Sequence, residues 1–382
     1  MIKRLKYLLG LFLLIGLGFF LLFKFSPSFK KSAQIAAVDK IGDVAMKRIA
    51  SNPEAEGSVA AEFINIPIEA REIADGILQA TGVGNAHVIK TTDGDVMFDT
   101  GLATQVPKQM KALKEAYPQL DLSHIILSHS HADHAGGTKF WQEEGMTIIA
   151  HAEFEEEQRY LKELEPYFWG RNRTLFPFMP EKPPNIGLIA TGGVVPTLTV
   201  NNGQNHKFSQ GGVDFEVLAL PGAEGADNIL LWLPQKKILL SGDFFGPLFP
   251  QFPNIFTMRG EKIRKPVEYI NSLGRIIELA PDMIVPSHKI PVTDKSVIMD
   301  GLVKMRDAVR YVHDATVAGM NAGKTVEELM RKIQLPPEFT LTEEHGKVSW
   351  AVKSIWEYYA TWFHFDKTTE LYGVPQLSLI HI

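Results

Sequence analysis

The sequence contains no cysteine among its 382 residues. This absence excludes disulfide bonds, thiolate metal ligands and a cysteine nucleophile, so any bound metal must be held by histidine and carboxylate side chains. The sequence also lacks a long basic run, and its formal net charge is −5, which argues against nucleic acid as a partner. Hydrophobic residues make up 45% of the chain and charged residues 22%, which is enough apolar side chain to form a globular core.

A strongly apolar run lies close to the N-terminus. Three basic residues among the first six precede an uncharged run over residues 7–23, which is the order found in an export signal. The run has about 17 residues, at the short end of what a membrane-spanning helix needs. We therefore expect a membrane-anchored, extracytoplasmic protein, periplasmic if bacterial, with an uncleaved signal anchor over residues 1–30. The alternative is a signal peptide cleaved near residues 32–37.

The middle of the chain alternates strand-like and helix-like patterns. Residues 86–90 and 95–99 flank an Asp93-Gly94 turn, which predicts a β-hairpin. Hairpins together with alternating helices indicate a mixed sheet in an α/β fold. Further apolar runs predict strands at 124–128, 147–150, 215–220, 229–233, 237–240 and 283–285, and helical spacing predicts helices at 106–117 and 153–164.

Beyond about residue 294 the pattern becomes helical, with helices expected at 297–318, 326–333 and 348–363. This change of pattern sets the expected domain boundaries. They are a signal anchor over 1–30, a linker with a short helix over 31–64, a catalytic domain over 65–296 and a helical region over 297–382.

Histidines and a carboxylate cluster directly after the predicted strand that ends at Ser128. His129, His131, Asp133 and His134 fall within six residues, and a loop at the carboxyl end of a strand can turn several side chains into one cavity. Two imidazoles two positions apart can share one metal ion, and the neighbouring aspartate and histidine can hold a second. Neutral imidazole and carboxylate suit zinc, and also manganese or iron. The alternative is a polar loop with surface histidines.

The pattern His-x-His-x-Asp-His, which starts at His129, resembles the signature of the metallo-β-lactamase superfamily. Phe98-Asp99-Thr100-Gly101, further upstream, resembles that family's Asp-Thr-Gly element. The resemblance implies an α/β fold of the αββα sandwich type with a C-terminal helical region. It also implies that Asp99 supports the site as the partner of a ligand histidine.

The resemblance implies three further metal ligands downstream. Pro221-Gly222-Ala223-Glu224, Ser241-Gly242-Asp243 and Pro286-Ser287-His288 occupy the corresponding places, each in a turn or after a predicted strand. Most of the superfamily has a histidine where this chain has Ala223, and an alanine side chain cannot bind a metal. Glu224 comes next, and Pro-Gly-x-Glu resembles the alkylsulfatase branch, in which a glutamate is the ligand.

Later segments also resemble alkylsulfatases. The stretch 248–264 resembles a segment near the sulfatase pocket, and its candidate substrate contacts are Asn254, Arg259 and Arg264. Taken together, the resemblance covers about residues 85–375 and implies a homodimer. The segments that resemble the alkylsulfatase dimerisation domain are 305–314, 319–324, 335–338, 362–363 and 369–372.

The sequence therefore predicts a hydrolase with two divalent metal ions, with zinc as the expected metal. By resemblance, the ligand set is His129, His131 and Glu224 for one ion and Asp133, His134 and His288 for the other, with Asp243 bridging. Asp133 and Asp243 would be catalytic carboxylates, next to a water that the metals activate to hydroxide. The expected substrate is a small anionic ester, most simply a sulfate ester.

Two other functions stay open. A lactonase, phosphodiesterase or thioesterase could use the same scaffold, because a fold alone does not fix the substrate. A non-catalytic binding protein that kept the fold is the other alternative. The complete ligand set argues against it, since a retired site is expected to lose ligands.

Overall fold

The structure is a computed structural model that describes residues 20–51, 66–175, 179–183, 193–255, 261–363 and 368–372. By its internal contacts the chain divides into two units. The first is Met1–Ile149 with Glu155–Leu198, and the second is Ala150–Phe154 with Thr199–Ile382. Each unit is built around one β-sheet.

The first unit is built on a seven-stranded mixed sheet in the order β1-β2-β3-β4-β5-β6-β7. Its strands are β1 (Ala70–Ala74), β2 (Ile77–Ala80), β3 (Ala86–Ile89), β4 (Asp95–Phe98), β5 (Leu122–Ile126), β6 (Thr147–His151) and β7 (Leu198–Val200). The antiparallel pairing of β3 with β4, with Gly94 at a φ of 81°, confirms the predicted hairpin. β4, β5 and β6 run parallel, so the loops that follow them meet at one edge of the sheet.

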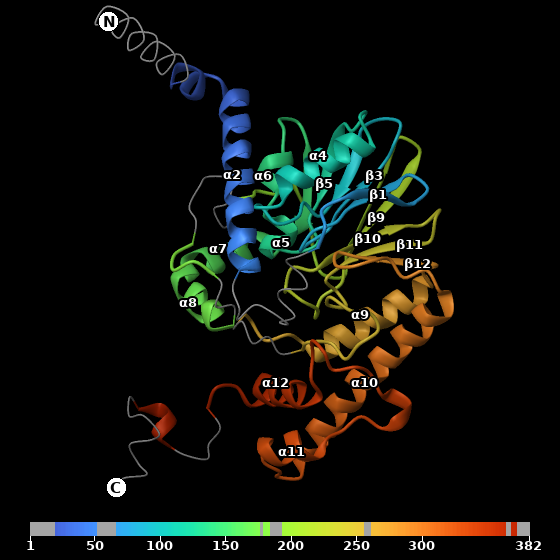
Figure 1. Ribbon diagram of the computed structural model, residues 1–382. Helices are drawn as coiled ribbons and strands as arrows, with labels where there is room; N and C mark the ends of the chain where they lie inside the picture. Colours follow the sequence, from blue (N-terminus) through green and yellow to red (C-terminus); the bar gives the residue numbers. More distant parts are fainter. Residues whose placement is uncertain are drawn as a thin grey trace, which may run out of the picture. The chain divides into compact units, whose positions relative to one another are not determined.

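Helices accompany this sheet in the first unit (Figure 1). They are α2 (Pro27–Ala50), α4 (Val106–Ala116), α5 (Ala132–Ala135), α6 (Thr138–Trp141), α7 (Phe154–Glu163) and α8 (Glu165–Leu175). The helix α2 packs against α4, and Lys108 forms an ion pair with Asp43. At 24 residues, α2 is much longer than the short linker helix that the sequence suggested.

The structure contradicts the predicted membrane-anchored location. Among the described residues, none of the helices has both the length and the apolar character that crossing a membrane requires. The long helix α2 carries Lys30, Lys31 and Lys40 among other charged side chains, which a membrane interior disfavours. The part of the apolar run up to residue 19 lies outside the described residues. The prediction of a membrane-anchored, extracytoplasmic protein is therefore wrong.

The second unit is built on a five-stranded mixed sheet in the order β12-β11-β10-β9-β8. Its strands are β8 (Asn205–Gln210), β9 (Val213–Ala219), β10 (Ile229–Leu233), β11 (Ile238–Gly242) and β12 (Met283–Pro286). The two central strands β10 and β11 are buried at every position, which explains why their sequences are nearly continuous apolar runs. β8 to β11 pair antiparallel, and β12 joins β11 in parallel.

Along the described part of the chain, one helix lies between β11 and β12 and the other helices of this unit follow β12. They are α9 (Pro266–Leu279), α10 (Lys295–Asn321), α11 (Val326–Lys332), η2 (Pro337–Phe339), α12 (Val348–Ala360) and η3 (Thr368–Leu371). The carboxylate of Asp294 caps α10 by accepting from the backbone N–H groups of Ser296 and Val297. The helices α9 and α10 lie side by side (Figure 1), and buried side chains from them, from α12 and from the sheet form one hydrophobic cluster.

Mixed sheets with flanking helices and a helical C-terminal part confirm the predicted fold class. The helices predicted at 106–117, 326–333 and 348–363 end within three residues of α4, α11 and α12. The helix α9 and the strand β8 were not predicted. The domain boundaries drawn at residues 65 and 297 stay predictions, because the two contact-based units divide the chain differently.

Candidate metal centre

The histidine-rich loop of the first unit follows β5 and contains the single-turn helix α5. His129 and His134 are fully buried, whereas His131 and Asp133 are partly exposed. The ring centroid of His129 lies 4.3 Å from that of His131 and 4.3 Å from that of His134. An oxygen of Asp133 lies 3.4 Å from Nε2 of His134. The loop therefore gathers its four predicted ligands in one place.

Glycines allow the backbone of this loop to pack closely against its neighbours. A Cβ atom at Gly84 would lie 1.9 Å from the carbonyl oxygen of Asp133, and one at Gly137 would lie 2.1 Å from the carbonyl oxygen of Thr100. Both distances are far below van der Waals contact, so neither position accommodates a side chain without a shift of backbone. Gly84 precedes β3, and its role could not be read from the sequence.

Asp99 directly follows β4, the strand next to β5, and from there its carboxylate supports the histidine-rich loop. Its Oδ1 accepts a hydrogen bond of 2.8 Å from the backbone N–H of Ser128. Its Oδ2 accepts a second, also 2.8 Å long, from the Ser128 hydroxyl. The same oxygen lies 2.9 Å from Nδ1 of His134. The contact between Asp99 and a histidine of the motif, which the resemblance implied, is therefore present.

Three other predicted residues follow strands of the second unit. β9 and β11 both run antiparallel to β10, and β12 runs parallel to β11, so the carboxyl ends of β9, β11 and β12 lie at one edge of the sheet. Glu224, Asp243 and His288 come just after these ends. Nε2 of His288 lies 3.1 Å from Oδ2 of Asp243, and the two side chains are 7% and 9% exposed.

Glu224 forms a buried ion pair with Arg264. Nη1 of Arg264 donates to Oε2 of Glu224 at 2.7 Å, and each side chain is only 5% exposed. The same nitrogen donates to the carbonyl oxygen of Asn254, and Nη2 lies 3.5 Å from an oxygen of Glu261. Arg264, which the sequence suggested as a substrate clamp, is thus engaged by protein acceptors. Asn254 contributes its backbone carbonyl here, and Arg259 lies outside the described residues.

Burial controls the protonation of two residues near these groups. The imidazole of His87, on β3, is fully buried, which lowers its pKa to about 4 although the charge of Asp99 acts in the opposite direction. In the second unit, burial and then the charge of Glu224 raise the pKa of Tyr269. The Tyr269 hydroxyl therefore stays protonated and donates to the carbonyl oxygen of Phe244 at 3.1 Å.

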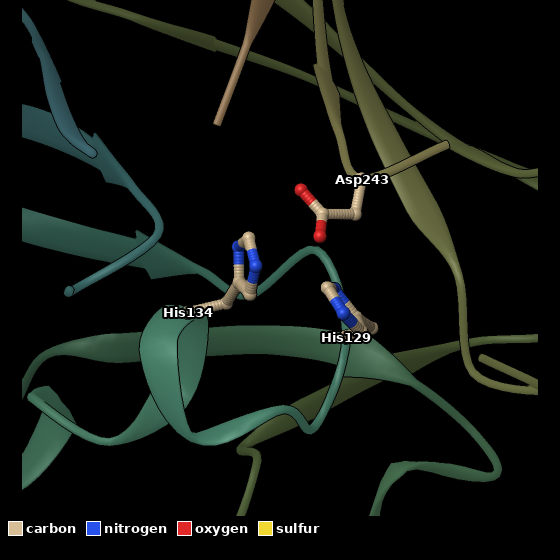
Figure 2. A group of neighbouring side chains, drawn as sticks. All are labelled: His129, His134 and Asp243. Carbon is tan, nitrogen blue, oxygen red and sulfur yellow. The ribbon is translucent and has the colours of Figure 1, made fainter. Parts of the chain in front are cut away.

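Two groups of described side chains could each hold a metal ion, and in each group one ligand atom per residue lies within 4.8 Å of the others. Figure 2 shows the first group, in which two imidazole rings and a carboxylate lie close together. Imidazole nitrogens and carboxylate oxygens are donors that zinc prefers, so the residues fit such an ion. The groups are His129, His134 and Asp243, and Asp133, His134 and His288.

Two of the predicted ligands, His131 and Glu224, are in neither group. The ring of His131 nevertheless stacks edge-on against His129, and Glu224 is held by Arg264. The structure also reveals a role for Ser128, which is buried and donates a hydrogen bond to Asp99; from the sequence, Ser128 was predicted only as the end of a strand. The sequence does place a hydroxyl-bearing residue directly before the first histidine of the motif, and this position was the signal that could have identified Ser128.

The comparison with known sequences agrees with this arrangement. The family model described as "Metallo-beta-lactamase superfamily" matches residues 80–288. The chain is 28% identical over 301 residues to a linear primary-alkylsulfatase from Pseudomonas sp., covering 73% of this chain and 56% of that protein. It is 25% identical over 320 residues to an alkyl/aryl-sulfatase from Saccharomyces cerevisiae, covering 76% of this chain and 49% of that protein. The chain thus spans about half the length of these curated relatives.

Solved structures show the same fold. The sec-alkylsulfatase Pisa1 from Pseudomonas sp. matches with a TM-score of 0.67 at 20% identity, covering 81% of this chain and 52% of that one. A metallo-beta-lactamase family protein from Thermus thermophilus matches with a TM-score of 0.50 at 19% identity, covering 75% of this chain and 94% of that one. Because the family model spans more than half of the sequence and includes every predicted metal ligand, the chain belongs to the metallo-beta-lactamase superfamily, and within it is similar to alkylsulfatases.

Proposed function

We propose that this protein is a hydrolase that uses two divalent metal ions, with zinc as the expected metal. The observation that carries this proposal is the pair of His/Asp groups, which have His134 in common. Because the two groups have this residue in common, they lie next to each other, and two adjacent donor groups suit two neighbouring ions, as in hydrolases with two-metal sites. Membership of a family of metal-dependent hydrolases supports the same function.

We assign the ligands as the motif suggests, with Asp243 between the two ions. The assignment is His129, His131 and Glu224 for one ion, Asp133, His134 and His288 for the other. The group Asp133, His134 and His288 supports the second set, and Asp243 groups with His129 of the first set and His134 of the second, which supports its bridging position. For Glu224, the ion would share the carboxylate with Arg264, whose Nη1 already donates to Oε2.

The chemistry follows from these donors. Two divalent ions bound there would lower the pKa of a bound water from about 15.7 towards about 7. The carboxylates of Asp133 and Asp243 are the proposed catalytic residues, because their oxygens can accept hydrogen bonds from the attacking water and orient it. The buried imidazoles of His129 and His134 exclude bulk water from one side of the site.

We propose a small sulfate ester as the substrate. The ligand carboxylates of Asp133, Glu224 and Asp243 would offset three of the four positive charges of two divalent ions, whereas the charge of Arg264 is paired with Glu224 and Glu261. A site with net positive charge favours an anionic substrate. The names of the curated relatives describe alkyl- and aryl-sulfatases, which points to the sulfate ester among anionic substrates.

A substrate panel tests this function. The purified protein, with zinc added or removed, would be assayed on alkyl sulfates of several chain lengths and on lactones, phosphodiesters, thioesters and carboxylic esters. We expect metal-dependent turnover that is fastest with sulfate esters. Faster turnover of another ester class would indicate a different hydrolase on the same fold. No turnover of any substrate, with metal bound, would favour a binding protein.

We also propose that the helical C-terminal part forms a homodimer, as its resemblance to a dimerisation domain suggests. Tyr358, Tyr359 and Trp362, in and after α12, are 40%, 45% and 68% exposed. Aromatic side chains of this kind are enriched at protein interfaces. Light scattering after size-exclusion chromatography should give the mass of two chains, and a variant with Trp362→Ser and Tyr358→Ser should shift towards one.

A further inference from the structure

Ser128 connects two parts of the candidate metal centre. The side chains of Ser128, His129, His134 and Asp99 are all fully buried. The Ser128 hydroxyl contacts Oδ2 of Asp99 at 2.8 Å and Nδ1 of His129 at 3.0 Å. These four residues therefore form one buried hydrogen-bonded network, in which every proton must have a definite place.

The proton of the Ser128 hydroxyl belongs to its bond with Asp99. An ionised carboxylate only accepts hydrogen bonds, so Oγ must donate to Oδ2 across the 2.8 Å contact. A hydroxyl has a single proton, so Oγ can only accept in its second contact, with Nδ1 of His129. The hydrogen of that bond must come from the imidazole. His129 therefore carries its proton on Nδ1 and has the lone pair on Nε2.

Asp99 fixes the tautomer of His134 by a direct contact. Its Oδ2 lies 2.9 Å from Nδ1 of His134, and the carboxylate again can only accept. One carboxylate therefore determines the tautomers of two imidazoles, directly for His134 and through a hydroxyl for His129. A neutral imidazole binds a metal through the nitrogen with the lone pair, which is Nε2 in both residues.

We propose that Ser128 is a positioning residue for the metal site: its hydroxyl orients the His129 ring and holds the tautomer that presents Nε2 to the metal. This inference rests on the proposed metal-binding function and extends it to a residue outside the ligand set. Without the hydroxyl, Nδ1 of His129 loses this hydrogen-bond acceptor in a fully buried place. Both tautomers then become populated, and metal binding must select one of them and fix the ring.

Two variants of the full chain, Ser128→Ala and Ser128→Thr, test this role. Zinc affinity would be measured by competition with a chelator, and the histidine tautomers by ¹⁵N NMR of the metal-free protein. We expect Ser128→Ala to weaken zinc binding by about 10- to 100-fold, the usual effect of removing a residue that supports a metal ligand. Ser128→Thr keeps a hydroxyl and should bind zinc like the wild type. His129 should show the Nδ1–H tautomer in the wild type and a mixture in Ser128→Ala.

A matched control separates this role from the loss of a buried hydroxyl in general. Ser354 in α12 is also fully buried, and its hydroxyl donates to the carbonyl oxygen of Ile255 at 3.5 Å. Ser354→Ala should leave zinc affinity and the tautomer of His129 unchanged.

Each outcome of this experiment has a clear meaning. Wild-type zinc affinity and an unchanged His129 tautomer in Ser128→Ala would overturn the role of Ser128 and leave the metal site standing. A wild-type protein that binds no zinc would overturn both proposals. If Ser128→Ala does not fold, the wild-type spectrum decides, because a proton on Nε2 of His129 contradicts the network and a proton on Nδ1 supports it.

Discussion

The guanidinium of Arg264 and the carboxylate of Glu224 form an almost completely buried ion pair, with Nη1 2.7 Å from Oε2. Arg264 also donates to the carbonyl oxygen of Asn254, 10 residues earlier in the chain. A buried charge that loses its partner is strongly destabilising, because neither water nor another charge replaces the lost interaction. Arg264 therefore holds the Glu224 carboxylate in place, and it acts on the candidate metal site through that carboxylate.

Arg264→Met should lower the free energy of unfolding by about 3–5 kcal/mol, because it leaves the Glu224 carboxylate buried without this partner. Urea unfolding of the metal-free protein measures the change. Arg275→Met is the control, since Arg275 pairs with Glu278 on the surface, where the two side chains are 61% and 66% exposed. That variant should lose little stability. Equal effects of the two substitutions would show that the buried pair has no special role.

Gly84→Ala should weaken metal binding although Gly84 is not a ligand. Its Cβ would lie 1.9 Å from the carbonyl oxygen of Asp133, so the backbone that carries this predicted ligand has to move. Such overpacking typically costs about 1–3 kcal/mol of stability. Gly274→Ala is the control, because a Cβ there meets no atom within 4 Å. Calorimetric titration with zinc would compare the variants, and undiminished affinity in Gly84→Ala would contradict the close packing of the loop.

His87 should make stability depend on pH between about 6.5 and 4. Its pKa is about 4 in the folded protein and near 6.5 when unfolded, so the unfolded chain binds more protons within this window. The free energy of unfolding should fall as the pH drops below about 6.5, and this contribution should level off below about 4. At about 1.4 kcal/mol per pKa unit, the total effect is roughly 3 kcal/mol.

His87→Gln removes this titration, so its stability should fall less steeply over the same pH window. Urea unfolding of the metal-free wild type and variant at a series of pH values measures the difference. Parallel pH profiles would mean that His87 is protonated with an ordinary pKa in the folded protein.

Elements with a local pattern could be predicted from the sequence. The strand predicted at 229–233 matches β10 at both ends, because a fully buried strand needs an unbroken apolar run. The strand β8 gave no such signal. It lies at the edge of its sheet, and its residues alternate between exposed and half-buried, so few apolar side chains are needed. The helix α9 starts at Pro266, just after the stretch 248–264 that resembles a sulfatase segment, and no element was predicted over its residues.

The candidate site also has one part that a local sequence pattern predicts and one part that no local pattern predicts. His129, His131, Asp133 and His134 lie on one short loop, so their proximity follows from the sequence alone. The pairing of Glu224 with Arg264 joins residues 40 positions apart, and it depends on how the chain folds between β9 and α9. No local pattern encodes such a pairing, and the same charge pattern on the surface would have suited a substrate contact equally well.

The metal content of the reconstituted full chain tests the central claim most directly. The protein would be incubated with zinc, freed of excess metal and measured by mass spectrometry, alongside Asp243→Ala and the control Ser354→Ala. We predict two zinc ions per chain in the wild type and in the control, and a clear loss in Asp243→Ala, because this carboxylate is assigned to both ions. A wild-type protein without bound metal, or an Asp243→Ala variant with the wild-type content, would contradict the proposed site.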